Sequence, residues 1–389
     1  MTLAAERLYL DHNATAPLRP QARAAMIEAL DVAGNPSSVH GDGRRARGIV
    51  EGAREALAAL CGVKARSVIF TGGATEANAL ALSPAWHDAS GPVYPDRLIM
   101  SAVEHPSVRS GGRFPPRQIR TLEVDRDGRV DLDHLDRLLA EGGTPLVSVM
   151  AANNETGVIQ PLAEIGARVA AVGGLFHVDA VQAAGRLALT PKDWHASAIS
   201  LSAHKMGGPQ GVGALVLSSS AVAPSALLVG GGQEHHRRAG TENVAGIAGF
   251  GAAARALADS SAEISRLAGL RALLEHGLRH ICSDSIIFGA DVERLANTVC
   301  FAVPGVPAEL ALIACDLKGV SLSSGSACSS GKVGVSHVLS AMGVEEDLAR
   351  CALRLSLGWT STEADVARFL DLWREVAGRL NPASVHRAA

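Results

Sequence analysis

The sequence predicts an α/β fold in which a mostly parallel sheet is covered by helices on both faces. Short apolar runs alternate with segments whose apolar residues follow helical spacing, as where the run 146–150 precedes the helical pattern 161–172. Most of the apolar runs end in glycines and polar residues. Because ligands bind at the carboxyl ends of the strands in such sheets, these polar clusters predict where the site lies.

The composition fits a protein of two packed domains. The chain has 389 residues, of which 47% are hydrophobic, and a net charge of −3, so it can bury a large core and lacks the positive charge typical of nucleic-acid binding. No apolar run approaches the roughly 18 residues that span a bilayer, and the N-terminus lacks a signal-peptide pattern. We expect a cytoplasmic protein with no nucleic-acid and no membrane partner.

The first quarter of the chain contains scaffold and a candidate phosphate site. Residues 9–17 predict a short strand that runs into a polar turn, and residues 44–60 have helical spacing. Strand 67–70 leads into 71–78, where a Gly-Gly turn opens a helix. Backbone N–H groups and a threonine hydroxyl gather there, so the turn either binds a phosphate or is an ordinary glycine turn whose threonine caps the helix.

Two further strands are predicted to end in polar side chains. Strand 97–103 runs into Glu104-His105-Pro106, where the proline keeps the histidine extended, so its ring either stacks on a planar cofactor or caps a loop. Strand 146–150 leads into the polar segment 153–157.

The glycine-rich segment 198–211 contains the residue that decides the chemistry. Its apolar start predicts a buried strand, which delivers polar side chains to a turn where backbone can approach a ligand; these are Ser202, His204 and Lys205. Upstream, strand 175–179 ends in Asp179. A lysine amine that forms a Schiff base and an aspartate that keeps a pyridine nitrogen protonated are the pair that pyridoxal phosphate requires. The sequence therefore favours such a site over a surface lysine packed on its turn.

The rest of the chain predicts a second domain. The polar loop 230–243 contains His235 and His236. Because no third metal ligand follows them, we interpret the segment as a loop that crosses a subunit or domain boundary rather than as a metal site. The predicted elements after strand 213–217 are a helical region 244–280, strand 298–303, helix 308–317 and strand 353–357. In the last strand Arg354 should face away from the leucines, and residues 360–363 predict a capping box that opens a terminal helix.

One cysteine differs from the other five. The six cysteines include no Cys-x-x-Cys pair, which argues against a zinc site or a disulfide framework, and most should be small buried hydrophobes. Cys328 instead stands among serines and glycines, a composition that predicts a mobile, exposed loop and a reachable thiol. The alternative is a free thiol that a loop tolerates.

A series of motifs along the chain carries a family resemblance. The motifs are YLDHNATAP (9–17), TGGATEANAL (71–80), EHPSV (104–108), NNETG (153–157), HVDAVQ (177–182), SAHKMGGPQGVGAL (202–215), RRAGTEN (237–243), SSGSAC (323–328) and LRLSLG (353–358). With them the chain resembles the cysteine desulfurases of the NifS/IscS type, within the fold-type I, class-V aminotransferase-like pyridoxal phosphate enzymes, and SSGSAC resembles their long-loop group. His12 and Ala79 depart from the family pattern, and we interpret them as marks of a subgroup.

The resemblance implies a fold-type I pyridoxal phosphate-dependent transferase. Its large domain, 15–250, would contain a mostly parallel seven-stranded sheet covered by helices. A smaller α+β domain, 1–14 and 251–389, would carry the cysteine loop.

The resemblance also implies residue roles. Lys205 would bind the cofactor aldehyde and then remove the substrate α-proton, while His105 would stack on the ring and help in proton transfer. With Cys328 these form the catalytic set. The cofactor would be bound by Gly73, Ala74, Thr75, His105, Asn154, Asp179, Gln182, Ser202, His204 and Lys205, with Thr241 reaching in from the other subunit of a homodimer. Arg354 would bind the substrate carboxylate, helped by Asn13 and Asn154. No metal ligand is assigned.

The implied activity is conversion of L-cysteine to L-alanine. The sulfur would pass to Cys328 as a persulfide and then to acceptor proteins such as an iron–sulfur scaffold, for iron–sulfur cluster assembly or other thiolation. A selenocysteine lyase, a transaminase and a non-catalytic sulfur carrier remain as alternatives. The acceptor, a general or nitrogenase-dedicated role, and transient holding of an iron–sulfur cluster at Cys328 stay open.

Overall fold

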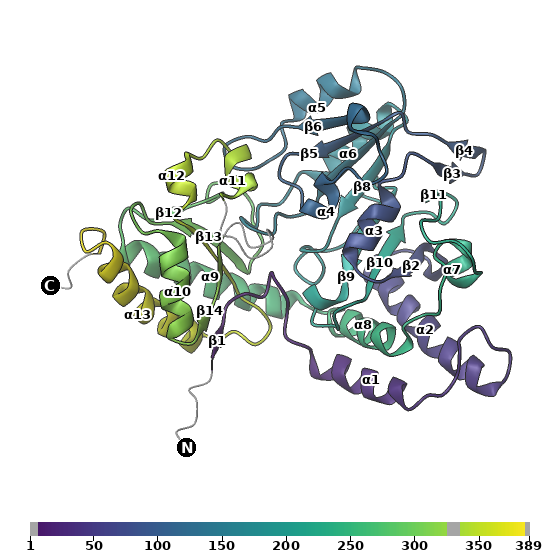
Figure 1. The fold of residues 1–389 in the computed structure, drawn as a ribbon, viewed down its shortest axis with the longest axis horizontal. Coiled ribbons are helices and arrows are strands. Elements are labelled where there is room, and N and C mark those ends of the chain that lie inside the picture. The colour runs from purple at the N-terminus through teal and green to yellow at the C-terminus, as the bar shows by residue number, and fades with distance from the viewer. Residues whose placement is uncertain (1–6, 325–334, 386–389) are drawn as a thin grey trace.

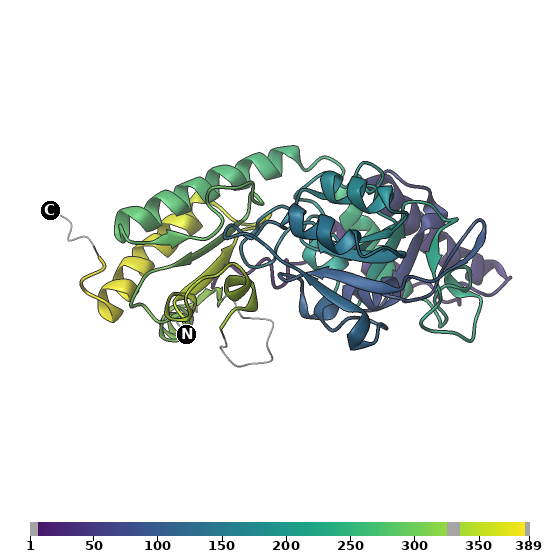
Figure 2. The ribbon, with the colours of Figure 1, turned by 90° about the horizontal axis from the view of Figure 1, so that it is seen from above.

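The computed structural model describes residues 7–324 and 335–385, which form two units side by side (Figure 1). A seven-stranded sheet lies at the centre of the larger unit and a four-stranded sheet at the centre of the smaller one. Figure 2 shows the long helix α9 (Ser261–Ile281) running along the smaller unit.

The seven-stranded sheet is mostly parallel, as predicted. Only β10 runs antiparallel to its neighbours, and the other described pairs are parallel. Its strands, in spatial order, are β2 (Val68–Thr71), β10 (Gly213–Leu217), β9 (Ala198–Ser202), β8 (Leu175–Asp179), β7 (Pro145–Met150), β5 (Arg97–Ser101) and β6 (Ile119–Leu122).

Both faces of this sheet are buried, which explains why its strands are apolar runs rather than alternating ones. In β2, for example, Val68 and Phe70 point into one core while Ile69 points into the core on the other face. Leu57 of α2 packs in the first core and Leu80 of α3 in the second. The helices of this unit are α1 (Pro20–Leu30), α2 (Gly41–Leu60), α3 (Ala74–Ala81), α4 (Pro106–Arg109), α5 (Leu132–Leu139), α6 (Leu162–Ala171), α7 (Gln233–His236) and α8 (Val244–Ala256). A small sheet at its periphery consists of β3 (Trp86–Asp88), β4 (Gly91–Val93) and β11 (Ala223–Pro224).

The smaller unit combines the two ends of the chain. Leu8 and Leu10 pack in the same core as α9 and the C-terminal helix, because β1 (Leu8–Tyr9) pairs in parallel with β14 (Val320–Ser321). The antiparallel four-stranded sheet has the order β12 (Ile286–Ile287), β13 (Thr298–Ala302), β16 (Ala352–Ser356) and β15 (Ser323–Ser324). The remaining helices are α10 (Ala308–Leu317), α11 (His337–Ala341), α12 (Glu346–Ala349) and α13 (Glu363–Leu380).

One predicted helical region divides into two helices, and the predicted capping box was wrong in detail. The predicted helical region 244–280 is two helices separated at 257–260, because Leu257 packs in the core of the larger unit whereas Leu267 packs in that of the smaller one. The capping box of α13 is formed by Thr362 and Asp365, whose backbone N–H and side chain exchange hydrogen bonds. The predicted start at 360 fails because 358–361 form a turn closed by Ser361 and Gly358.

The loop 230–243 includes a short helical turn, α7. Glu234, His235 and His236 have φ values of 48°, 56° and 62°, a conformation that costs a non-glycine residue free energy. No helix in the described part of the chain is long and apolar enough to cross a membrane.

Candidate active site

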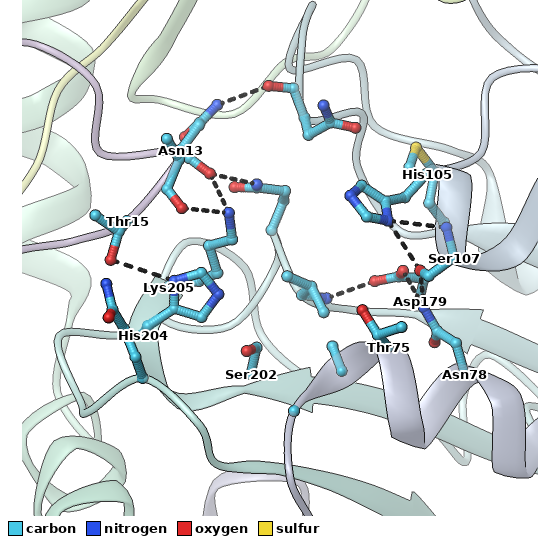
Figure 3. A pocket seen from close by; sticks show the side chains of 18 of the residues that line it. Asn13, Thr15, Thr75, Asn78, His105, Ser107, Asp179, Ser202, His204 and Lys205 are labelled. Atoms are coloured by element: carbon cyan, nitrogen blue, oxygen red, sulfur yellow. Dashed lines mark hydrogen bonds between the residues drawn. The ribbon is translucent and has the colours of Figure 1, made fainter. Parts of the chain in front are cut away.

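A cavity of about 460 Å³ lies at the carboxyl ends of the central strands. Its wall combines residues that follow β2, β5, β7, β8 and β9 with Asn13 and Arg354 of the smaller unit. Figure 3 shows Asn13, His105, Asp179 and Lys205 among the residues of this wall. The predicted site residues that line it are Asn13, Gly73, Ala74, Thr75, His105, Asn154, Asp179, Gln182, Ser202, His204, Lys205 and Arg354. Residues from distant parts of the sequence therefore meet where the strand pattern predicted a site.

One end of the cavity is formed by the start of α3. Gly73 is the N-cap residue, and no side chain caps the helix, so the alternative of a threonine cap is wrong. The first-turn backbone N–H groups and the positive end of the helix dipole suit an anion there. Glu76 does not line the cavity: its carboxylate accepts from Gly72 N at 2.7 Å and pairs with Arg238 at 2.9 Å.

The carboxylate of Asp179 also lines the cavity. Asp179 is buried at the end of β8, and its Oδ2 and Oδ1 accept from Asn78 Nδ2 at 2.9 Å and Val181 N at 3.0 Å. These two donors fix its orientation. Such a carboxylate suits a protonated pyridine nitrogen.

Lys205 lies in the 3-10 turn that follows β9. Its Nζ donates to the carbonyls of Asn13 and Ala14, the latter at 2.7 Å, and Gln182 Nε2 also donates to the Asn13 carbonyl at 3.1 Å. The N-terminal motif therefore contacts the Lys205 amine through its own backbone carbonyls. Together, the lysine, the Asp179 carboxylate and the uncapped start of α3 fit pyridoxal phosphate.

Burial lowers the pKa of two histidines in the cavity wall. Burial, with a contribution from Lys205, lowers the pKa of His204 to about 4, and its Nδ1 lies 3.2 Å from Thr15 Oγ1. Burial also lowers the pKa of His105, Asp179 raises it and Lys205 lowers it further. As the proline predicted, His105 is extended, with φ −61° and ψ 148°.

Arg354, on β16, also lines the cavity. Its Nη1 donates to the Asn154 carbonyl at 3.0 Å and its Nη2 pairs with Asp11 at 2.8 Å. Leu353 and Leu355 point into the core of the smaller unit, so the predicted alternation along this strand is confirmed. The side-chain amide of Asn13 links the two units, since its Nδ2 donates to the Asn154 carbonyl and to Thr298 Oγ1.

The sequence analysis missed several buried polar residues beside the cavity. Burial and the charge of Asp179 raise the pKa of Glu104 well above its ordinary value, although Met150 N donates to it at 2.6 Å. His177 lies between the hydroxyls of Ser148 and Ser200 at 2.9 Å each, and burial lowers its pKa to about 4. The signal that could have found them is their position inside or beside the motifs.

Asn78 and Ser107 line the cavity and were missed as well. Asn78 lies three residues after Thr75 on α3, one helical turn further, which puts both on one side of the helix. Ser107 is the second residue after His105, in the first turn of α4.

Of the predicted residues that the structure describes, Thr241 does not line the cavity. Thr241 is exposed, and Cys328 lies outside the described residues. The other five cysteines are buried, as predicted. His12 is buried as well: it makes an edge contact with the Tyr9 ring, and a Cβ on Gly358 would overlap its ring.

Comparison with known proteins relates the chain to one family along nearly its whole length. The aminotransferase class-V family pattern matches residues 8–369. The chain is 39% identical over 386 residues to a cysteine desulfurase IscS of Dictyoglomus turgidum, covering 98% of this chain and 97% of the relative. It is 38% identical over 385 residues to a cysteine desulfurase of Cereibacter sphaeroides, covering 97% and 98%. Among solved structures, a NifS-like protein from Rickettsia africae matches with a TM-score of 0.85 and 35% identity, over 95% of this chain and 99% of the other.

Proposed function

The chain belongs to the class-V aminotransferase family, and within it to the cysteine desulfurases, and from this premise we propose how it takes sulfur from L-cysteine and where it delivers it. The enzyme depends on pyridoxal phosphate and converts L-cysteine to L-alanine. One observation carries the residue assignment: Lys205, Asp179, His105 and Arg354 come from four distant segments and line one cavity.

Bound in this cavity, pyridoxal phosphate would supply an electron-withdrawing ring that stabilises negative charge at the substrate α-carbon. Gly73, Ala74, Thr75, Ser202 and His204 would hold its phosphate, and Asp179 its ring nitrogen. Gln182 would bind the ring hydroxyl oxygen.

Arg354 would bind the carboxylate of L-cysteine. The Arg354 side chain is buried, and Arg354 and Lys205 both line the cavity. A substrate bound there would have its α-carbon between the group that binds the carboxylate and the amine that removes the α-proton.

Cys328 would accept the sulfur. As a thiolate it would attack the substrate sulfur, so that an S–S bond forms, the C–S bond breaks and its electron pair remains on the carbon, which takes up protons to give alanine. The persulfide would then pass to an acceptor, for which an iron–sulfur scaffold protein or a thiolation partner is our proposal.

We also propose a cytoplasmic homodimer in which Thr241 of one subunit completes the phosphate site of the other. Thr241 is exposed in the described chain, and the segment that carries it is anchored beside the phosphate end by the pair of Arg238 with Glu76. An exposed threonine in this segment is available to a neighbouring subunit.

The first experiment measures alanine and sulfide formation from L-cysteine with added reductant, in wild type and Cys328→Ser, while the cofactor spectrum is recorded. We expect the wild type to form both products, and the variant to keep its cofactor and lose both. A variant as active as wild type would refute transfer through Cys328 and favour a lyase that releases sulfur without an enzyme thiol.

The same assay separates the alternatives. Much faster turnover of selenocysteine would indicate a selenocysteine lyase, and formation of pyridoxamine phosphate with a keto acid would indicate a transaminase. If Lys205→Ala left the cofactor absorption unchanged, the chain would be a non-catalytic sulfur carrier rather than an enzyme.

A further inference from the structure

A line of hydrogen bonds joins the carboxylate of Asp179 to the ring of His105 (Figure 3). Asn78 Nδ2 donates to Asp179 Oδ2 and to Ser107 Oγ, at 2.9 Å each. Ser107 Oγ lies 2.8 Å from His105 Nδ1. The two end residues are the expected contacts with the cofactor ring, and the two residues between them connect those contacts.

The direction of each bond follows from which atoms can donate. A carboxylate only accepts, so the Asn78 amide must turn its NH2 group toward Asp179. The second hydrogen of that NH2 group goes to Ser107 Oγ. The hydroxyl of Ser107 therefore has its own proton left for His105 Nδ1.

The backbone determines the state of His105 Nδ1 independently. His105 is the N-cap of α4, and its Nδ1 accepts from the backbone N–H of Ser107 at 3.2 Å. Because a backbone N–H can only donate, Nδ1 has no proton. A neutral imidazole then carries its proton on Nε2.

The other ring nitrogen is left to face the ligand. His105 Nε2 has no hydrogen-bond partner among residues 7–324 and 335–385, and Figure 3 shows it on the side of the ring turned toward Lys205. Burial keeps the ring neutral by lowering the pKa of His105.

We propose that Asn78 and Ser107 are positioning residues that hold His105 as the Nε2–H tautomer, with this donor directed into the cavity. The proposal rests on the proposed desulfurase function and makes His105 a hydrogen-bond donor to an electron-rich atom of the bound substrate or cofactor. A neutral ring already protonated at Nε2 cannot accept a proton there, so removal of the α-proton falls to Lys205.

The tautomer can be read without cofactor or substrate. Long-range 1H–15N correlation spectra of the histidine-labelled full chain, freed of pyridoxal phosphate, distinguish the two protonation sites, and His105→Gln assigns the ring. We expect a protonated Nε2 and an unprotonated Nδ1. A wild-type ring protonated at Nδ1 overturns the proposal. This outcome does not depend on whether the chain is a desulfurase, which the alanine and sulfide assay tests separately.

A pair of variants at Ser107 tests the relay. Ser107→Ala removes the hydroxyl and Ser107→Thr keeps it. In Ser107→Ala only the longer backbone bond holds the ring, so we expect a measurable population with the proton on Nδ1, and an unchanged ring spectrum overturns the role of Ser107. For L-cysteine we expect kcat to fall roughly five- to tenfold, the equivalent of one neutral hydrogen bond, with KM changed less than about twofold.

The conservative variant separates positioning from packing. Ser107→Thr should recover the wild-type kcat, and Asn78→Leu, which keeps the side-chain size but removes both donors, should behave like Ser107→Ala. Equal losses in Ser107→Thr and Ser107→Ala would show that only packing matters and overturn the proposal.

Discussion

Arg54 and Arg354 are both buried beside acidic residues, and they differ in how completely they are paired. The side chain of Arg54, on α2, is 4% exposed. Its Nη1 and Nη2 pair with both oxygens of Glu234 at 2.6 and 3.0 Å, Nη1 also reaches the Val68 carbonyl, and Nε faces Glu51 at 3.2 Å. Every nitrogen of this guanidinium has a partner.

Arg354 is as deeply buried but only partly paired. Its side chain is 2% exposed, and its two terminal nitrogens donate to one carbonyl and one carboxylate, that of Asp11. Its Nε has no partner among the residues described.

The difference fits a structural role for Arg54 and the substrate-binding role proposed for Arg354. Two of the three Arg54 nitrogens hold Glu234, the first of three consecutive residues with positive φ, so the ion pair offsets local backbone strain. Arg354 keeps donor capacity toward a cavity. A buried guanidinium with unused donors is costly in the free protein, and a bound carboxylate would satisfy them.

Removing the fully paired Arg54 should lower the free energy of unfolding more than removing Arg354. Arg54→Met leaves the Glu234 carboxylate, whose side chain is 2% exposed, without its cation. We expect the free energy of unfolding to fall by about 3–5 kcal/mol, measured by urea denaturation. Arg45→Met, an exposed position on the same helix, is the matched control and should change it by less than about 0.5 kcal/mol.

The double variant Arg54→Met with Glu234→Gln sharpens this test. Removing the unpaired charge should recover a large part of the loss. If the single and double variants are equally unstable, packing of the Arg54 side chain rather than its charge accounts for the effect, and the contrast between the two arginines fails.

Removing the partly paired Arg354 should affect catalysis more than stability. Arg354→Gln removes the charge that would bind the substrate carboxylate, so we expect kcat/KM for L-cysteine to fall roughly 100-fold, equivalent to about 3 kcal/mol. The loss of stability should be smaller than in Arg54→Met, because the Asp11 side chain is 19% exposed and stays partly hydrated. Steady-state kinetics and urea denaturation of one preparation test both. Normal kcat/KM with a large loss of stability would make Arg354 a second structural arginine.

The glutamate beside Arg354 predicts a pH dependence. Burial raises the pKa of Glu155 from its ordinary value of 4.5 to about 7, although a hydrogen bond from Ser336 and the charge of Arg354 lower it. Because the folded-state pKa is the higher one, the folded protein binds more protons between pH 4.5 and 7, and ionisation of Glu155 lowers the free energy of unfolding as pH rises through this range. Below pH 4.5 the penalty is absent, and above pH 7 it is complete.

Glu155→Gln should remove this penalty. Relative to wild type, we expect the variant to gain on the order of 2–3 kcal/mol between pH 5 and pH 8, measured by urea denaturation at both values. Glu164→Gln, at an exposed position on α6, is the control and should differ from wild type equally at both. A stability difference that does not change with pH would show that Glu155 ionises as it does in the unfolded chain.

The sequence predicted the strand-end half of the site better than the half formed between the units. Asp179, Lys205 and His105 each follow an apolar run directly, so periodicity and chain order were enough to place them at one sheet edge. The hydrogen bonds of Asn13 with Asn154 and Thr298 join segments more than 100 residues apart, and no local pattern reports such pairing.

By itself the sequence determined the mostly parallel α/β fold, the strand ends that carry the site, the family resemblance and the burial of five cysteines, because local apolar patterns and motif order specify these features. Only the tertiary structure decided that Arg354 has an unpaired Nε among the described residues, which nitrogen of His105 faces the cavity, and that Asn78 and Ser107 connect Asp179 to that ring. These properties depend on which donors meet which acceptors across the fold, and that is set by packing rather than by spacing along the chain.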